Sequence, residues 1–282
     1  MKRLILILLV MTLSTAAPAA NMELKLRSRV GTAKDSGKFE LVTKLEHWDP
    51  HKTAVVICDM WDRHWCKAAA ARVAEMAPRM NLVVAKLRNQ GVLIIHCPGE
   101  TMKFYADHPA RKAALAAPPA TPLTRRGPVI PPGPLPIDDS DGGCSDGQPC
   151  PQGLVWTREI ATLEIKPNDG ISDKGNEVYN LMWQKGVENV IVMGVHTNMC
   201  VLNRPYAIKA LVNKGMNVAL MRDLTDTMYN PRMPPKVDHF TGTDLVIEFI
   251  ETYWCPSLTS DQVLGGAPFR FAADKRSGID SR

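Results

Sequence analysis

The sequence predicts an α/β protein with a three-layer α/β/α arrangement around a mostly parallel central sheet. Short, apolar, β-branched runs such as TAVVIC (53–58) and NVIVM (189–193) have the composition of buried strands. Longer segments with helical periodicity separate these runs, and several of them end at a glycine. Strands that alternate with helices of this length form parallel β-α-β units with right-handed crossovers.

The first half of the predicted fold begins with the strand 53–58. An alanine-rich helix follows over 66–90 and ends before Gly91, which can adopt the backbone conformation that stops a helix. VLIIHC (92–97) has the apolar run of a second buried strand, and a short helix is expected around 102–117.

The second half resumes after a proline-rich stretch. TLEIK (162–166) is predicted as the third strand, and a helix near 175–185 leads to the fourth strand at 189–193. A helix over 200–214 and a fifth strand, NVALM (217–221), come next. The last predicted helix covers 242–254, with Thr243 as its N-cap.

The chain is expected to be exported. Residues 1–20 carry a charged start, an apolar core and small residues before a cleavage site, which is typical of a secretory signal peptide. Residues 21–282 then form a single domain, interrupted by a Pro/Gly-rich insertion at about 118–150. We therefore expect a periplasmic or secreted protein with no membrane association after cleavage of the leader.

Charge and composition show no pattern typical of nucleic-acid binding, and a small-molecule substrate is expected. The formal charge of +5 falls to +3 without Lys2 and Arg3 (5 − 2 = 3), the basic residues are scattered, and aromatic residues make up only 6%. Seven cysteines in an exported chain permit disulfides. Cys144 and Cys150, which flank a short polar loop, are the best candidate pair.

Candidate functional side chains follow the strands. In an open parallel sheet, ligands bind beyond the carboxyl ends of the strands, and those ends deliver Asp59, Lys166 and Cys200 to one edge. A cysteine that opens a helix lies near unpaired backbone N–H groups, which favour its thiolate. A carboxylate could carry the proton away, and the turn could stabilise an oxyanion.

These motifs resemble a known family. VIVMGVHTNMCV resembles the Gly-Val-x-Thr-x-x-Cys-Val signature of the isochorismatase-like cysteine hydrolases, the group that contains nicotinamidases and N-carbamoyl amidohydrolases. AVVICDMWD resembles their aspartate strand, and EIKPNDGISDKG resembles their lysine strand. The resemblance extends from about residue 52 to 255, apart from the insertion, and implies the three-layer fold of that family.

The resemblance implies a catalytic triad and its mechanism. Cys200 would be the nucleophile, Asp59 the general base and then acid, and Lys166 the electrostatic partner, with Lys174 as a less suitable competitor. It also implies a cis peptide between Val195 and His196, which aims backbone N–H groups at the oxyanion. The relatives often form oligomers, so a homo-oligomer is expected.

Other residues have two open interpretations. Trp61, His64 and Trp65 follow Asp59, and they either line the substrate pocket or pack in the core, as does Trp156 beyond the insertion. Tyr229 either shapes the site or organises a loop.

No metal or other cofactor is expected. Nicotinamidases bind a divalent ion through an Asp-x-His pair after the second strand, and this chain has no such pair there. Asp62 and His64 have that spacing in a different segment, and the acidic loop DDSDGGCSDG lacks the EF-hand spacing.

The leading hypothesis is therefore an exported cysteine hydrolase that cleaves a C–N bond of a small amide- or carbamoyl-type substrate through a thioester. A nicotinamidase proper, or a non-catalytic binding or scaffold protein on the same fold, are the alternatives. A vinyl-ether hydrolase of the isochorismate kind is disfavoured by the cysteine, and a thiol–disulfide oxidoreductase by the lack of a Cys-x-x-Cys motif.

Overall fold

The computed structural model describes residues 21–32, 37–121, 132–147 and 150–277. The predicted leader at 1–20 and part of the insertion, 122–131, lie outside these ranges. Within them, no helix is both long enough and apolar enough to cross a membrane.

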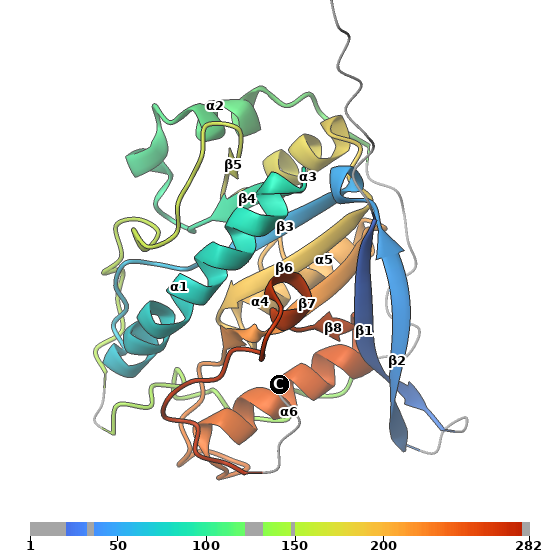
Figure 1. Ribbon diagram of the computed structural model, residues 1–282. Coiled ribbons are helices and arrows are strands. Elements are labelled where there is room, and N and C mark those ends of the chain that lie inside the picture. The colour runs from blue at the N-terminus through green and yellow to red at the C-terminus, as the bar shows by residue number, and fades with distance from the viewer. Residues whose placement is uncertain (1–20, 33–36, 122–131, 148–149, 278–282) are drawn as a thin grey trace, which may run out of the picture.

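An eight-stranded sheet organises the described chain, in the order β2-β1-β8-β7-β6-β3-β4-β5. The six strands from β3 to β8 pair in parallel, whereas β1 and β2 form an antiparallel hairpin at one edge (Figure 1). The strands are β1 Met22–Gly31, β2 Phe39–Trp48, β3 Thr53–Cys58, β4 Leu93–Cys97, β5 Gly170–Ile171, β6 Asn189–Val195, β7 Asn217–Asp226 and β8 Ser257–Leu258.

Helices cover both faces of the sheet, and successive residues of β3 show why. Ala54, Val56 and Cys58 belong to a core shared with the helices α3, α5 and α6, whereas Val55 and Ile57 belong to a core shared with α1. This alternation is the two-residue period of a strand buried on both faces. The α-helices are α1 Lys67–Asn89, α2 Pro109–Ala116, α3 Gly175–Gln184, α4 Cys200–Asn203, α5 Ile208–Asn213, α6 His239–Tyr253 and α7 Asp261–Leu264. Short 3-10 turns, η1 Pro50–Lys52 and η2 Met102–Tyr105, complete the set.

The α/β class and the order of the main elements agree with the prediction, and one strand does not. Residues 162–166 form turns and irregular chain, so the prediction of a third strand there is wrong. The strand at that place in the sheet is the two-residue β5, which pairs with β4 at His96 and Ile171. The apolar composition of 162–166 suggested a buried strand. Leu163 is indeed buried, in the core shared with α1, but the segment pairs with no strand.

Two helices also differ from the expectation. The segment 200–214 splits into α4 and α5, because Pro205 forces the preceding Arg204 into an extended conformation. The helix expected at 242–254 begins earlier, at His239, since Asp238 accepts hydrogen bonds from the N–H groups of Phe240 and Thr241. Thr243 lies within the helix and does not cap it.

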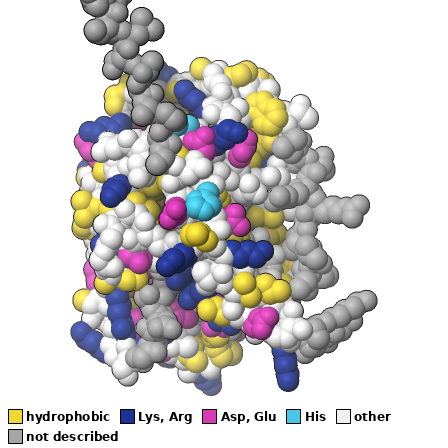
Figure 2. Space-filling view, turned by 45° about the vertical axis from the view of Figure 1, so that its right-hand side comes forward, with side chains coloured by type: hydrophobic (Ala, Val, Ile, Leu, Met, Phe, Trp, Pro, Cys, Tyr) yellow, Lys and Arg dark blue, Asp and Glu magenta, His cyan; other side chains and the backbone are white. Residues whose placement is uncertain are grey.

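The surface around the β1–β2 hairpin is of mixed character. Figure 2 shows basic and acidic side chains next to one another on this face, with hydrophobic side chains between them. Leu41 and Leu45 of β2 are more than half exposed, and β2 is the edge strand of the sheet. The sequence prediction began at residue 53 and missed this hairpin, because β1 alternates buried and exposed residues only over its first half, β2 is mostly exposed, and both strands carry many charges.

Candidate active site

Asp59 lies at the centre of a buried polar group at the carboxyl end of β3. Its side chain is fully buried, and its φ of 45° turns the chain sharply after the strand. Its Oδ1 accepts a hydrogen bond of 2.7 Å from the N–H of Gly99, beyond the end of β4. A Cβ atom on Gly99 would lie 2.8 Å from this oxygen, so only glycine permits such a close approach.

Arg204 and Tyr206 complete the surroundings of this carboxylate. Nε of Arg204 donates to Oδ2 of Asp59 at 3.0 Å, and the Tyr206 hydroxyl donates to Oδ1 at 3.2 Å. Burial raises the pKa of Asp59, while the Arg204 charge and the hydrogen bonds from Cys200 and Gly99 oppose that rise. The result is a carboxyl group with a raised pKa beside a fixed cation, which suits a group that exchanges protons.

Cys200 is the third member of the group. It opens α4, directly after the turn that follows β6, and it lies close enough to Asp59 for each side chain to shift the pKa of the other. Burial and the negative charge of Asp59 raise the pKa of the Cys200 thiol to about 12, and Arg204 only partly offsets this. The raised pKa of Cys200 disfavours the resting thiolate that the sequence suggested, because burial and the charge of Asp59 outweigh Arg204. The four-residue α4 supplies too weak a field to outweigh burial and a neighbouring carboxylate.

The turn between β6 and Cys200 has the geometry that the resemblance implied. The Val195–His196 peptide bond is cis, and Gly194 before it has a φ of 111°. A Cβ atom on Gly194 would lie 2.1 Å from the carbonyl oxygen of Cys58, so this glycine lets β6 and β3 approach at the site. Since Cys200 is the first residue of α4, its N–H has no acceptor within that helix and is available for an oxyanion.

Lys166 is not brought to this group. Its ammonium pairs with Glu164, and 45% of its side chain is exposed. The segment that carries it is not a strand, so it does not present its residues at the sheet edge as the sequence reading required. Lys174, the competitor, is also exposed and pairs with Asp173. The cation beside Asp59 and Cys200 is Arg204.

An aromatic group lies beside the turn, built from the predicted pocket residues. Trp61 and Trp156 stack with ring centroids 4.1 Å apart, and His64 lies 4.8 Å from Trp65 and 4.9 Å from His196. Burial lowers the pKa of His64 to about 4 and that of His196 to about 3, so both imidazoles are neutral. The Nε2 atom of His196 and the Nε1 atom of Trp156 are buried without a hydrogen-bond partner among the described residues.

Tyr229 belongs to the 229–237 loop and does not line the cavity beside Cys200. It is fully buried, and its hydroxyl donates to the carbonyl of Met233 and accepts from the N–H groups of Lys236 and Val237. The interpretation that it shapes the site is therefore wrong, and its alternative role in organising the 229–237 loop is the one observed. Its length suits this task because the hydroxyl reaches across the loop while the ring packs on Gly242.

A cavity of about 400 Å³ opens beside the thiol. Its lining residues are Leu135, Asp139, Asn198, Met199, Cys200, Asn203, Arg204 and Pro205. The insertion contributes Leu135 and Asp139, and Asp139 accepts a 2.6 Å hydrogen bond from the Asn198 side chain. The insertion thus forms one wall of the space in front of Cys200.

Sequence reasoning missed Arg204, Tyr206 and Gly99. Arg204 stands four residues after Cys200, which is one helical turn, and this spacing is a signal that could have placed it on the same side. It also missed the buried trio in which His96 lies 2.7 Å from Glu159 and 3.3 Å from Asp169. Because Glu159 follows an irregular segment, no strand pattern pointed to it.

Several solved structures resemble this chain in the arrangement of their elements, and three of them have different described activities. A cysteine hydrolase from Pseudomonas syringae pv. phaseolicola is 17% identical, with a TM-score of 0.48 over 76% of this chain and 92% of the other. An isochorismatase from Pseudomonas putida is 10% identical, with a TM-score of 0.46 over 76% and 91%. A ribonuclease from Caenorhabditis elegans is 15% identical, with a TM-score of 0.44 over 77% and 83%.

No protein-family model matches the sequence, and no curated protein matches it either.

Proposed function

We propose that this chain is a hydrolase in which Cys200 attacks the carbonyl carbon of a small amide- or carbamoyl-type substrate. The observation that carries the proposal is that Cys200 and Arg204 line one cavity, and that Arg204 pairs at 3.0 Å with the buried Asp59 carboxylate, whose charge raises the pKa of Cys200. A nucleophile within hydrogen-bond reach of a base that a third group orients is the arrangement of covalent catalysis.

The first half of the reaction follows from this geometry. As the sulfur bonds to the carbonyl carbon, its proton passes to Asp59 and the carbonyl electrons move to oxygen. The backbone N–H of Cys200 faces that oxyanion, a contribution of about 3–4 kcal/mol for such a donor. Collapse of the adduct breaks the C–N bond, and protonated Asp59 gives its proton to the departing nitrogen.

The second half regenerates the enzyme. Water attacks the thioester carbon and gives a proton to Asp59, the C–S bond breaks, and the sulfur takes the proton back. Arg204 stays charged throughout and offsets the negative charge that moves between sulfur and carboxylate. In this mechanism Arg204 takes the place that the resemblance assigned to Lys166.

The cavity sets the size and class of substrate. A volume of about 400 Å³ fits a small molecule, and its wall combines apolar groups with an arginine and amides. Amide and carbamoyl compounds offer both a carbonyl carbon for the thiol and a polar edge for the Arg204 guanidinium in the cavity wall.

The test is a panel of small amides, ureides and carbamoyl compounds, assayed with the wild type, Cys200→Ala and Asp59→Asn. We expect turnover by the wild type, loss of at least about 10³-fold in both variants, and an acyl adduct on Cys200 in the mass spectrum with a slow substrate. Full activity of Cys200→Ala would overturn the mechanism. Binding without turnover by any compound would favour the non-catalytic alternative.

We also propose that the protein is exported, because residues 1–20 have the three regions of a signal peptide. Expression of the full chain in a bacterial host, followed by fractionation and N-terminal sequencing, should find a mature chain that begins near residue 20 outside the cytoplasm. A full-length chain in the cytoplasmic fraction would contradict this proposal.

A further inference from the structure

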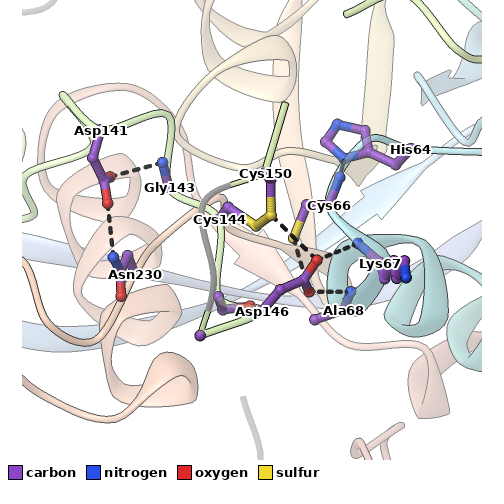
Figure 3. The surroundings of a disulfide bond; sticks show 12 residues. His64, Cys66, Lys67, Ala68, Asp141, Gly143, Cys144, Asp146, Cys150 and Asn230 are labelled. Atoms are coloured by element: carbon purple, nitrogen blue, oxygen red, sulfur yellow. Dashed lines mark hydrogen bonds between the residues drawn. A yellow bond between two sulfur atoms is a disulfide. The ribbon is translucent and has the colours of Figure 1, made fainter. Parts of the chain in front are cut away.

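Three cysteines and one aspartate meet at the beginning of α1, apart from the group around Cys200. The sulfur atoms of Cys66, Cys144 and Cys150 and a carboxylate oxygen of Asp146 all lie within 4.8 Å of one another. Figure 3 shows Cys66 at the start of the helix, facing the loop that carries the other three. Cys144 and Cys150 are joined by the disulfide that the sequence predicted.

The four side chains form a ligand set of a recognisable kind. Three thiolates and one carboxylate are ligands that Zn²⁺ takes in a closed tetrahedral site. Oδ1 of Asp146 lies 3.5 Å from the sulfur of Cys66, and Oδ2 lies 3.2 Å from the sulfur of Cys150. Cys66 is fully buried and Cys144 is 7% exposed, so bulk water is kept away from two of the ligands.

The surrounding backbone and charges hold these ligands in place. The Asp146 carboxylate accepts hydrogen bonds from the N–H groups of Lys67 at 2.8 Å and Ala68 at 2.7 Å, which fix its orientation. Outer contacts of this kind orient metal ligands and raise affinity. Arg72 donates to Ser145 at 3.3 Å and supplies positive charge beside a group that would carry four negative charges.

We propose that the reduced protein binds one Zn²⁺ ion through Cys66, Cys144, Cys150 and Asp146, and that oxidation of Cys144 and Cys150 to the disulfide releases it. On binding, three thiols lose their protons to solvent while three Zn–S bonds and one Zn–O bond form. On oxidation by a low-molecular-weight disulfide, the Zn–S bonds of Cys144 and Cys150 break and their two thiolates give up two electrons to form one S–S bond. The S–S bond of the oxidant breaks, and its two halves take two protons from solvent and leave as thiols. Cys66 then takes a proton from solvent.

The test uses the full chain and cobalt as the spectroscopic probe. Protein reduced with a phosphine and then freed of it should bind one Co²⁺ per chain, with the intense bands of tetrahedral thiolate coordination, and Zn²⁺ should displace it. Protein oxidised with diamide should bind less than about a tenth of an equivalent. Cys200→Ala, which removes a thiol outside the group, is the matched control and should bind like the wild type.

The ligand variants separate a metal site from a plain disulfide with a packed thiol beside it. Cys66→Ser and Cys150→Ser should each weaken Zn²⁺ binding by more than the 10–100-fold that loss of an outer contact costs. Cys150 is half-buried, so its variant serves if Cys66→Ser does not fold. No stoichiometric binding by the reduced wild type, or unchanged binding by a folded ligand variant, would overturn the proposal.

Discussion

At the scale of single residues, the unusual property of Cys200 is that its thiol resists ionisation. Burial and Asp59 raise its pKa to about 12, so in the proposed mechanism attack on a substrate coincides with proton transfer to Asp59. That mechanism requires the acid and the cation beside the sulfur to act together. Two predictions separate their contributions.

The first prediction concerns thiol reactivity. Asp59→Asn removes the negative charge that raises the pKa of Cys200 and leaves Arg204 beside the sulfur, so the pKa should fall. At a fixed pH below both pKa values, the thiolate fraction rises about tenfold for each pKa unit. We expect faster alkylation of Cys200 by iodoacetamide at pH 8 in this variant, together with loss of hydrolysis. Slower alkylation than in the wild type would contradict the charge assignment.

The second prediction concerns the cation. Arg204→Gln leaves the buried Asp59 carboxylate without its charged partner, and we expect kcat/KM to fall by at least about 10²-fold, or roughly 3 kcal/mol. Lys166→Gln is the matched control, because Lys166 pairs with Glu164 at the surface, and it should stay within about twofold of the wild type. Equal losses in the two variants would show that Lys166 reaches the site during turnover.

At the scale of secondary-structure elements, the strands that carry Asp59 and Cys200 were predictable and the connecting segments were not. β3 and β6 are buried on both faces, which leaves continuous apolar runs in the sequence. The cation was misassigned because 162–166 has the composition of a strand but packs as an irregular segment. The partner of Asp59 comes instead from the chain between α4 and α5, where Pro205 ends the helical pattern.

The third prediction concerns the start of α6. Asp238 accepts hydrogen bonds from two backbone N–H groups of the first turn. Asp238→Ala should lower the free energy of unfolding by about 1 kcal/mol, and Asp238→Asn, which keeps the accepting oxygen, by less. Urea denaturation of the three proteins measures the difference. If Thr243→Ala lowers the free energy of unfolding as much as Asp238→Ala does, Thr243 caps the helix as the sequence predicted.

At the scale of the whole molecule, the central parallel strands could be predicted from the sequence, whereas the strands at the edges of the sheet could not. The hairpin strands β1 and β2 are charged and largely exposed, apart from alternate residues in the first half of β1. β5 and β8 have two residues each, too few for any periodicity. In the site, the motif identified Asp59 and Cys200, while Gly99 and Tyr206 depend on three-dimensional packing. The homo-oligomer stays a prediction, which sedimentation can test. The exposed Leu41 and Leu45 on the edge strand are the residues to vary.

The fourth prediction concerns stability and pH. Burial lowers the pKa of His96, but the charge of Glu159 and the hydrogen bonds to Asp169 and Glu159 outweigh it and raise the pKa to about 9. Because the folded value exceeds the unfolded value of about 6.5, the stabilisation is complete below pH 6.5 and is lost as the pH rises through 9. At about 1.4 kcal/mol per pKa unit, it amounts to no more than about 3.5 kcal/mol.

Unfolding measurements from pH 6 to pH 10 on the wild type and His96→Gln isolate this contribution. The wild type should be the more stable protein at pH 6, and the difference should shrink toward pH 10. A difference that grows with pH would mean that His96 is neutral in the folded state.

Leu135 and Asp139, which line the cavity beside the Cys200 sulfur, belong to residues 132–147. These residues form no strand of the sheet. Within this stretch Asp139 holds Asn198, and Cys144 and Asp146 belong to the cysteine cluster at the start of α1, whereas Leu135 lines the cavity without taking part in the bonds that join Asp59 to its partners. In the proposed mechanism, substrate preference can therefore change at Leu135 while the reacting groups stay as they are. A library randomised at Leu135 is consequently the place to search for altered substrate preference.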